Sequence, residues 1–233
     1  MPFIMNNLAI IPARGGSKRI PRKNIKDFLG RPIIAYSIEV ALKSSLFSEV
    51  MVSTDDEEIA AIAGKYGAVV PFLRSKKNSD DYATTMDVIG EVLENYRNKF
   101  DKAFEYSCCI YPTAPFITQE DLKEGFLKIT STDLKSVFPV VEFDTPIWRG
   151  LAFDENENIK MLWKEYQNSR SQDLKKVYHD AGQWYWINPN IIGNDMYSDN
   201  SKCIIISREK VQDIDTMTDW RLAELKYGFI YNT

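Results

Sequence analysis

The sequence is poor in the residues that build metal centres, disulfide frameworks and membrane spans. Its 233 residues include one histidine, His179, and three cysteines. A single histidine argues against a multi-histidine metal site. An odd number of cysteines, two of them adjacent at Cys108 and Cys109, argues against a disulfide framework. No apolar run approaches the roughly 18 residues that a membrane span needs, and the first residues lack the basic stretch of a secretory signal. We therefore expect a cytoplasmic protein with reduced, buried thiols and no membrane contact.

Two common phosphate-binding patterns are also absent. The chain has neither the G-x-G-x-x-G fingerprint of dinucleotide-binding domains nor a Walker A loop. The first absence counts heavily against an oxidoreductase that binds a dinucleotide. The net charge of −4 argues against a general nucleic-acid-binding surface, so we expect no nucleic-acid partner.

A dense group of cations follows the first apolar run of the chain. That run, Leu8 to Ile11, is typical of a buried strand that ends abruptly in a loop. The next residues include Gly15 and Gly16, whose backbone N–H groups can approach a ligand closely. A polyphosphate needs converging amide dipoles and point charges, and the cations available are Arg14, Lys18, Arg19, Arg22 and Lys23. The loop indicates triphosphate binding, with a solvated basic loop as the alternative.

Strand and helix patterns alternate through the first half of the chain. We expect a helix from Pro32 to about Phe47, a strand at 50–55, a helix at 56–66 and a short strand at 68–72. This rhythm predicts an α/β fold with a mostly parallel sheet, whose ligands bind beyond the carboxyl ends of the strands. The length, residues 1–233, suits one domain. From about 148 to 176 the rhythm stops, and we interpret this segment as an excursion from the sheet.

A pair of carboxylates stands near the C-terminus. Asp213 and Asp215 are two residues apart, so in extended backbone their side chains share one face. Two such oxygen ligands suit Mg²⁺, which typically binds one or two carboxylates together with substrate phosphates. The alternative is a loop acid at Asp213 and a helix cap at Asp215 or Thr216.

Several of these segments resemble the CMP-sialic acid synthetase (acylneuraminate cytidylyltransferase) family. The run from Ala13 to Lys18, followed by Lys23 and Asn24, is similar to the N-terminal motif of that family, and 213–216 is similar to its metal site. The similarity touches five places spread over nearly the whole chain. It implies a three-layer, mostly parallel, Rossmann-like nucleotidyltransferase sheet. It also implies an enzyme that joins CTP to a nine-carbon 2-keto sugar acid, with Mg²⁺ as cofactor and pyrophosphate as the second product.

The resemblance implies a role for individual residues. Catalysis would depend on Arg14, Lys18 and Asp213, and Mg²⁺ would bind Asp213 and Asp215. The nucleotide would contact Ala13, Arg14, Gly15, Gly16, Ser17, Lys23, Asn24, Asp81, Thr85 and Tyr111. The alternative for this segment is a helix start, with Asp81 or Thr84 as its N-cap. Tyr111 stands where the family has a glutamine that helps to recognise cytosine, so recognition of the base stays open.

For the sugar acid, the resemblance points to Arg170, Gln172, His179, Asp180 and Gln183. An arginine can bind a carboxylate through two parallel hydrogen bonds. The segment 178–186 resembles the pseudaminic acid branch of the family, and a lone histidine is also compatible with a structural role. The alternatives are N-acetylneuraminate, legionaminate or 3-deoxy-manno-octulosonate as the acid, or a non-catalytic nucleotide-sugar sensor.

The excursion at about 148–176 is expected to make a homodimer. In the family, an extension of this kind packs on a second subunit. Leu162, Trp163 and Tyr166 would suit the core of such an interface. A flap folded onto its own domain is the alternative.

Overall fold

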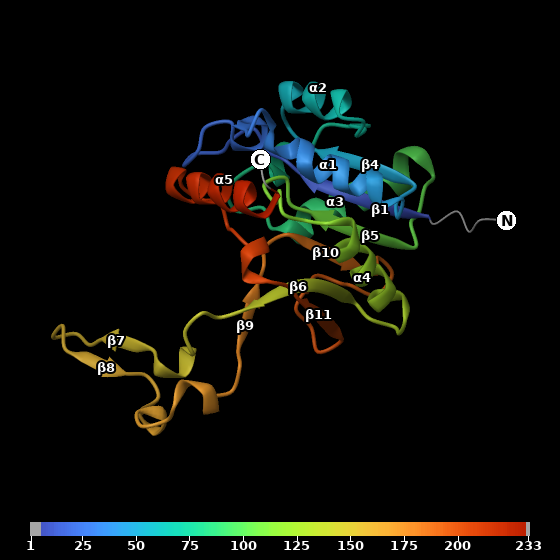
Figure 1. The fold of residues 1–233 in the computed structure, drawn as a ribbon. Coiled ribbons are helices and arrows are strands. Elements are labelled where there is room, and N and C mark those ends of the chain that lie inside the picture. The colour runs from blue at the N-terminus through green and yellow to red at the C-terminus, as the bar shows by residue number, and fades with distance from the viewer. Residues whose placement is uncertain (1–5, 232–233) are drawn as a thin grey trace.

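The computed structural model describes residues 6–231, and its centre is a seven-stranded mixed sheet (Figure 1). The strands of this sheet are β1 Asn7–Pro12, β4 Glu49–Ser53, β5 Tyr106–Ile110, β6 Ser136–Glu142, β9 Tyr178–Asp180, β10 Trp184–Ile187 and β11 Ser201–Ile205. Their order is β11-β6-β10-β5-β1-β4, and β9 pairs with the far end of β6. A two-stranded ribbon, β2 Asp27–Phe28 and β3 Arg31–Pro32, lies outside the sheet.

Most strands of the sheet share one direction, as the sequence predicts. β1 runs parallel to β4 and β5, and β6 runs parallel to β11. Two strands are exceptions: β10 is inserted antiparallel between β5 and β6, and β9 runs antiparallel to β6. The prediction of a short strand at 68–72 is wrong, because that segment is joined to the sheet by a single isolated bridge, between Met51 and Val69.

Helices cover both faces of the sheet and give the three layers that were expected. They are α1 Ile33–Ser44, α2 Glu57–Lys65, α3 Thr85–Phe100, α4 Gln119–Thr130 and α5 Met217–Tyr231. Buried side chains of α1, α2 and α4 pack with one face of β1, β4 and β5, and those of α3 pack with the other face. Burial on both faces explains why β1 is apolar at successive positions, with Leu8 to Ile11 fully buried.

Two helices begin with a reciprocal cap between a threonine and the aspartate three residues later. Thr84 accepts a hydrogen bond from the backbone of Asp87, whose carboxylate accepts from the backbone of Thr84. Thr118 and Asp121 make the same arrangement at α4. Each of these reciprocal caps satisfies two backbone N–H donors that a helix start leaves free. Both helices start beside the carboxyl ends of strands, so these caps fix loops that border the site described below.

The excursion between β6 and β9 projects away from the sheet (Figure 1). It contains the hairpin β7 Leu151–Phe153 and β8 Ile159–Met161. Trp148 packs against Trp163 and Tyr166, with ring centroids 5.5 and 5.6 Å apart. Leu151, Phe153, Ile159 and Leu162 remain 57–74 % exposed. The two strands of this segment form a sheet of their own, and the rings of Trp148, Trp163 and Tyr166 pack together beside it.

The thiols partly follow the prediction. Cys108 and Cys109 are buried in β5, whereas Cys203 on β11 is exposed, so the expectation of burial is wrong for Cys203. All three are free thiols. Over residues 6–231 we find no helix with the length and apolarity that crossing a membrane would require.

Candidate active site

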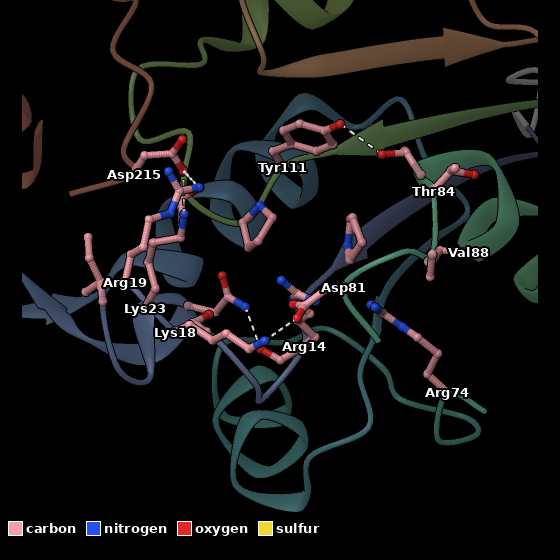
Figure 2. A pocket seen from close by; sticks show the side chains of 18 residues that line it. Arg14, Lys18, Arg19, Lys23, Arg74, Asp81, Thr84, Val88, Tyr111 and Asp215 are labelled. Atoms are coloured by element: carbon pink, nitrogen blue, oxygen red, sulfur yellow. Dashed lines mark hydrogen bonds and ion pairs between the residues drawn. The ribbon is translucent and has the colours of Figure 1, made fainter. Parts of the chain in front are cut away.

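Two cavities adjoin at the carboxyl end of the sheet. The first, which we name the basic cavity, has a volume of about 580 Å³ and lies where β1 and β5 end (Figure 2). The second cavity has a volume of about 830 Å³ and is bordered by β9, the start of the excursion and α5. Tyr111 and Thr113, just after β5, line both. Two ligands bound side by side would therefore meet at these residues.

Four of the five cations after β1 line the basic cavity. They are Arg14, Lys18, Arg19 and Lys23. The fifth, Arg22, turns outward and pairs with Asp56 and Glu58 at the start of α2. The loop thus places four cations at the cavity, while the fifth binds the start of α2 and holds the loop in position.

Two carboxylates, Asp81 and Asp215, pair with these cations. Asp81 pairs with Arg14 at 2.8 Å and also with Lys18. Asp215 lies 2.8 Å from Arg19 and 3.7 Å from Lys23. Hydrogen bonds from Lys18 and Arg14 lower the pKa of Asp81. Asp81 is therefore a partner of the cations rather than a helix cap, since Thr84 caps α3.

Arg74 is a cavity residue that the sequence analysis missed. It is only 8 % exposed, yet it lines the basic cavity. Its Nε donates to Ser53 Oγ at 3.0 Å, and it also donates to the Ser53 carbonyl. No ion pair to Arg74 occurs within residues 6–231, and burial lowers its pKa. The available signal was a lone arginine directly after the apolar segment 68–73.

Three expected nucleotide contacts do not line the basic cavity. Ala13 is buried, and its N–H donates to the Ser53 carbonyl. Gly15 donates its N–H to Asp55 at 2.9 Å, and a Cβ there would lie 2.6 Å from Asp56 Oδ2. The space around a Cβ at Gly16 is open. Gly15 thus allows the loop to pass close to Asp56 at the start of α2. The N–H of Gly15 is hydrogen-bonded to Asp55 and does not point into the basic cavity.

The other expected nucleotide contacts do line the basic cavity. Ser17, Asn24, Thr85 and Tyr111 are among its lining residues. Asn24 Nδ2 donates to the Arg14 carbonyl at 2.9 Å, which ties the two halves of the basic loop together. The Tyr111 hydroxyl lies 2.9 Å from Thr85 Oγ1. The Tyr111 ring packs at 5.3 Å from Tyr185 of the second cavity, so it forms the wall between the cavities.

Asp213 and Asp215 face different cavities. Asp215 lines the basic cavity and Asp213 the second. Burial raises the pKa of Asp213, and the charge of Asp215 raises it further. Mutual repulsion of this kind is relieved by a cation, and Mg²⁺ usually takes one or two carboxylates plus substrate phosphates. Across residues 6–231 no group of three or more ligating side chains forms. The pair therefore fits a magnesium ion that substrate completes, rather than an all-protein cage.

Two of the expected sugar contacts line the second cavity. His179 is exposed there, with its ring 4.8 Å from that of Phe143. The Asp180 carboxylate accepts from Gly182 N at 2.8 Å, the Tyr185 hydroxyl at 2.6 Å and the Tyr197 hydroxyl at 2.5 Å. Since three donors already engage Asp180, this carboxylate mainly orients the two tyrosines.

The remaining expected sugar contacts lie outside the second cavity. Gln183 is 3 % exposed, and its amide donates to the Lys210 carbonyl at 2.5 Å. Arg170 is exposed on the excursion and pairs with Asp173 at 2.7 Å. Gln172 lines a separate cavity of about 120 Å³ beside the excursion. Because the excursion projects from the sheet, a single chain does not bring Arg170 or Gln172 to its own site.

Comparisons with known proteins agree on one family. A model described as cytidylyltransferase matches residues 8–212. The chain is 44 % identical to pseudaminic acid cytidylyltransferase from Campylobacter jejuni, over 96 % of this chain and 97 % of that protein. It is 33 % identical to CMP-N,N'-diacetyllegionaminic acid synthase from Legionella pneumophila, over 94 % of this chain and 95 % of that protein. Among solved structures, CMP:2-keto-3-deoxy-manno-octonic acid synthetase complexed with CTP is similar, with a TM-score of 0.70 and 16 % identity over 97 % of this chain and 99 % of that one.

Proposed function

The chain belongs to the cytidylyltransferase family, and on that premise we propose that it activates pseudaminic acid, a nine-carbon 2-keto sugar acid, with CTP. The products are the CMP-sugar and pyrophosphate. The choice of acid is supported by 44 % identity over 96 % of the chain to a relative named for that activity. The legionaminic acid synthase is also related, at lower identity.

The observation that carries this proposal is the charge of the basic cavity. Its lining includes two carboxylates, Asp81 and Asp215, and five cations, Arg14, Lys18, Arg19, Lys23 and Arg74. An excess of positive charge at the carboxyl ends of parallel strands suits a triphosphate. Figure 2 shows Lys23 and Arg19 on one side of the cavity and Arg74 on the other. The nucleotide would bind between them, with the acid in the second cavity beyond Tyr111.

The reaction is a displacement at the α-phosphorus of CTP. The anomeric 2-hydroxyl oxygen of the acid forms a bond to this phosphorus, and the bond to the β-phosphate oxygen breaks. The hydroxyl proton leaves to solvent and pyrophosphate departs. Arg14 and Lys18 would neutralise charge on the departing pyrophosphate, while the two cavities hold the reactants in line.

Mg²⁺ is part of the proposal, held by Asp213 and Asp215. When bound, it would supply charge neutralisation at the α-phosphate and a lower pKa for the attacking hydroxyl. Asp215 would at the same time keep Arg19 and Lys23 in place, because it already contacts both. Asp213, on the side of the second cavity, would face the acid.

We also propose a cytoplasmic homodimer joined through the excursion. The exposed apolar side chains of the hairpin, among them Leu151, Phe153 and Ile159, support a contact with a second copy. Arg170 and Gln172 would approach a sugar site only in such a dimer. The free, buried thiols of Cys108 and Cys109 are compatible with a reducing compartment. Sedimentation equilibrium tests the dimer, and a monomer at micromolar concentration would refute it.

The function is tested by pyrophosphate release with CTP and Mg²⁺. The panel contains pseudaminic, legionaminic, N-acetylneuraminic and 3-deoxy-manno-octulosonic acids. Release with pseudaminic acid alone is expected. Release with another acid instead would keep the chemistry and change the substrate. CTP binding without release for any acid would favour a nucleotide-sugar sensor.

The assignment of Lys18 and Asp213 is tested in the same assay. We expect Lys18→Ala or Asp213→Ala to lower turnover at least about a hundredfold, the scale of losing one donor to transition-state charge. The matched control is Lys65→Ala, since Lys65 is exposed on α2 away from both cavities. Turnover near that of the control at saturating CTP and Mg²⁺ would refute the assignment.

A further inference from the structure

Two cations that nucleotide binding does not require line the second cavity. Lys226 lies on α5, and Arg208 begins the 3-10 turn Arg208–Lys210 just after β11. Both side chains border the same cavity, and burial lowers the pKa of Lys226, with a smaller lowering from the charge of Arg208. Two like charges at one wall of a cavity favour an anion between them.

The two cations differ in what already holds them. Arg208 pairs with Asp144, and both side chains are more than half exposed at the rim. Lys226 is half-buried, and its Nζ donates to the Val211 carbonyl at 2.8 Å. No carboxylate within residues 6–231 forms an ion pair with Lys226. An ammonium has three donors, so Lys226 retains donors for a ligand.

The rest of the second cavity is acidic. Its carboxylates are Asp144, Asp180 and Asp213. Asp180 already accepts from three donors, and Asp213 belongs to the metal pair. A negatively charged ligand that enters this cavity therefore finds available positive charge mainly at Lys226. A ligand placed elsewhere would have its charge beside a carboxylate.

The chemistry of the sugar acid also requires a cation at the part of the second cavity that Lys226 lines. In a 2-keto sugar acid the carboxylate and the reacting hydroxyl are attached to one carbon atom. The group that binds the carboxylate must therefore lie beside the reaction centre, near Asp213. Lys226 meets this condition, because it contacts Val211, two residues before Asp213. Arg170, which the sequence pattern favoured, lies on the projecting excursion and pairs with Asp173.

We propose that Lys226, assisted by Arg208, binds the carboxylate of the sugar acid. This inference rests on the proposed function, because it names the anchor of that substrate. Arg208 would exchange its exposed partner Asp144 for the ligand. Lys226 would provide the stronger contact, since it has no carboxylate to give up.

The test compares Lys226→Gln with Arg221→Gln, which removes the same charge from an exposed position on the same helix. We expect Lys226→Gln to raise the KM for pseudaminic acid about tenfold or more, the scale of a charge-assisted hydrogen bond. The KM for CTP should stay within about twofold. Lys226→Arg should restore most of the affinity for the acid, because the charge returns. Arg221→Gln should match the wild type in both constants.

Three results would overturn the proposal. One is an unchanged KM for the acid in Lys226→Gln. Another is a rise that appears in Arg170→Gln instead. The third is an equal rise in the KM for CTP together with a lower Tm, which would indicate a structural role. If the wild type releases no pyrophosphate with any acid of the panel, the proposed function fails. In that case calorimetry measures the Kd for pseudaminic acid directly. Equal Kd values for the wild type and Lys226→Gln, or no binding by either protein, would overturn the role of Lys226 as the carboxylate anchor.

Discussion

Replacing Gly15 with alanine should destabilise the protein, whereas the same change at the next residue should not. A Cβ at Gly15 would lie 2.6 Å from Asp56 Oδ2, 3.1 Å from Asp56 Cβ and 3.2 Å from Asp56 Cγ. At Gly16 nothing lies within 4 Å of the added atom. The pair of variants thus adds one methyl group at adjacent positions of the same loop, with and without a steric conflict.

Asp56 cannot move away from Gly15 without losing contacts on two sides. Its Oδ1 accepts from the backbone of Ile59 at 3.0 Å and caps α2, and its carboxylate also binds Arg22. Loss of an N-cap costs about 0.5–2 kcal/mol, and a hydrogen bond to a charged group contributes about 1.5–3 kcal/mol. Neither contact would be lost completely. We therefore expect Gly15→Ala to lower the free energy of unfolding by about 1–3 kcal/mol.

The two variants are compared by urea and thermal unfolding. For a chain of this length each kcal/mol shifts Tm by about 2–4 °C, so Gly15→Ala should melt several degrees below the wild type. Gly16→Ala should be neutral or slightly stabilising, because alanine restricts the unfolded chain. Equal stability of the two variants would show that Asp56 yields freely, and the reasoning from close approach would then be wrong.

Three further predictions concern the charges around the basic cavity. Arg74→Met should raise the KM for CTP about tenfold or more, because Arg74 is a buried guanidinium that lines the basic cavity. The control Arg97→Met, on the surface of α3, should leave the KM for CTP unchanged. Equal KM values for CTP in the two variants would exclude Arg74 as a nucleotide contact. Asp81→Asn should lower the KM for CTP about two- to fivefold, the scale of an exposed ion pair that CTP no longer has to displace, and a higher KM would show that Asp81 itself contacts the nucleotide. Arg22 is the largest of the causes that lower the pKa of Asp56 from 3.8 to about 2, together with backbone hydrogen bonds from Ile59 and Glu58. The Arg22–Asp56 pair therefore stabilises the fold above pH 3.8 and loses its effect as the pH falls through about 2. The difference in urea midpoint between the wild type and Arg22→Gln should therefore shrink as the pH falls between these values, and a constant difference would show that the stabilisation does not come from the Arg22–Asp56 pair.

The order and type of most elements could be predicted from local patterns. The apolar run 8–11, the helix start at Thr84 with Asp87 and the start at Thr118 with Asp121 all depend on neighbouring residues, whose effects act through the backbone itself. The cytidylyltransferase motifs were also readable, because they are short and contiguous. Strand direction was not readable at β10: alternation along 183–187 predicts a strand, but the neighbours β5 and β6 decide that it runs antiparallel.

The sequence by itself determined which residues after β1 are cations, which carboxylates stand near the C-terminus, and to which family the chain is related. Only the tertiary structure decided how these charges are used. In the folded chain Arg22 pairs with Asp56 at the start of α2, and Asp81 pairs with Arg14 and Lys18. Arg74 is buried and donates to Ser53. The tertiary structure also placed Arg170 on the projecting excursion, and it brought Lys226 to the Val211 carbonyl in the cavity that Asp213 also lines. The physical reason is that a charged side chain takes the partner that packing brings within reach, and residues distant in sequence supply that partner.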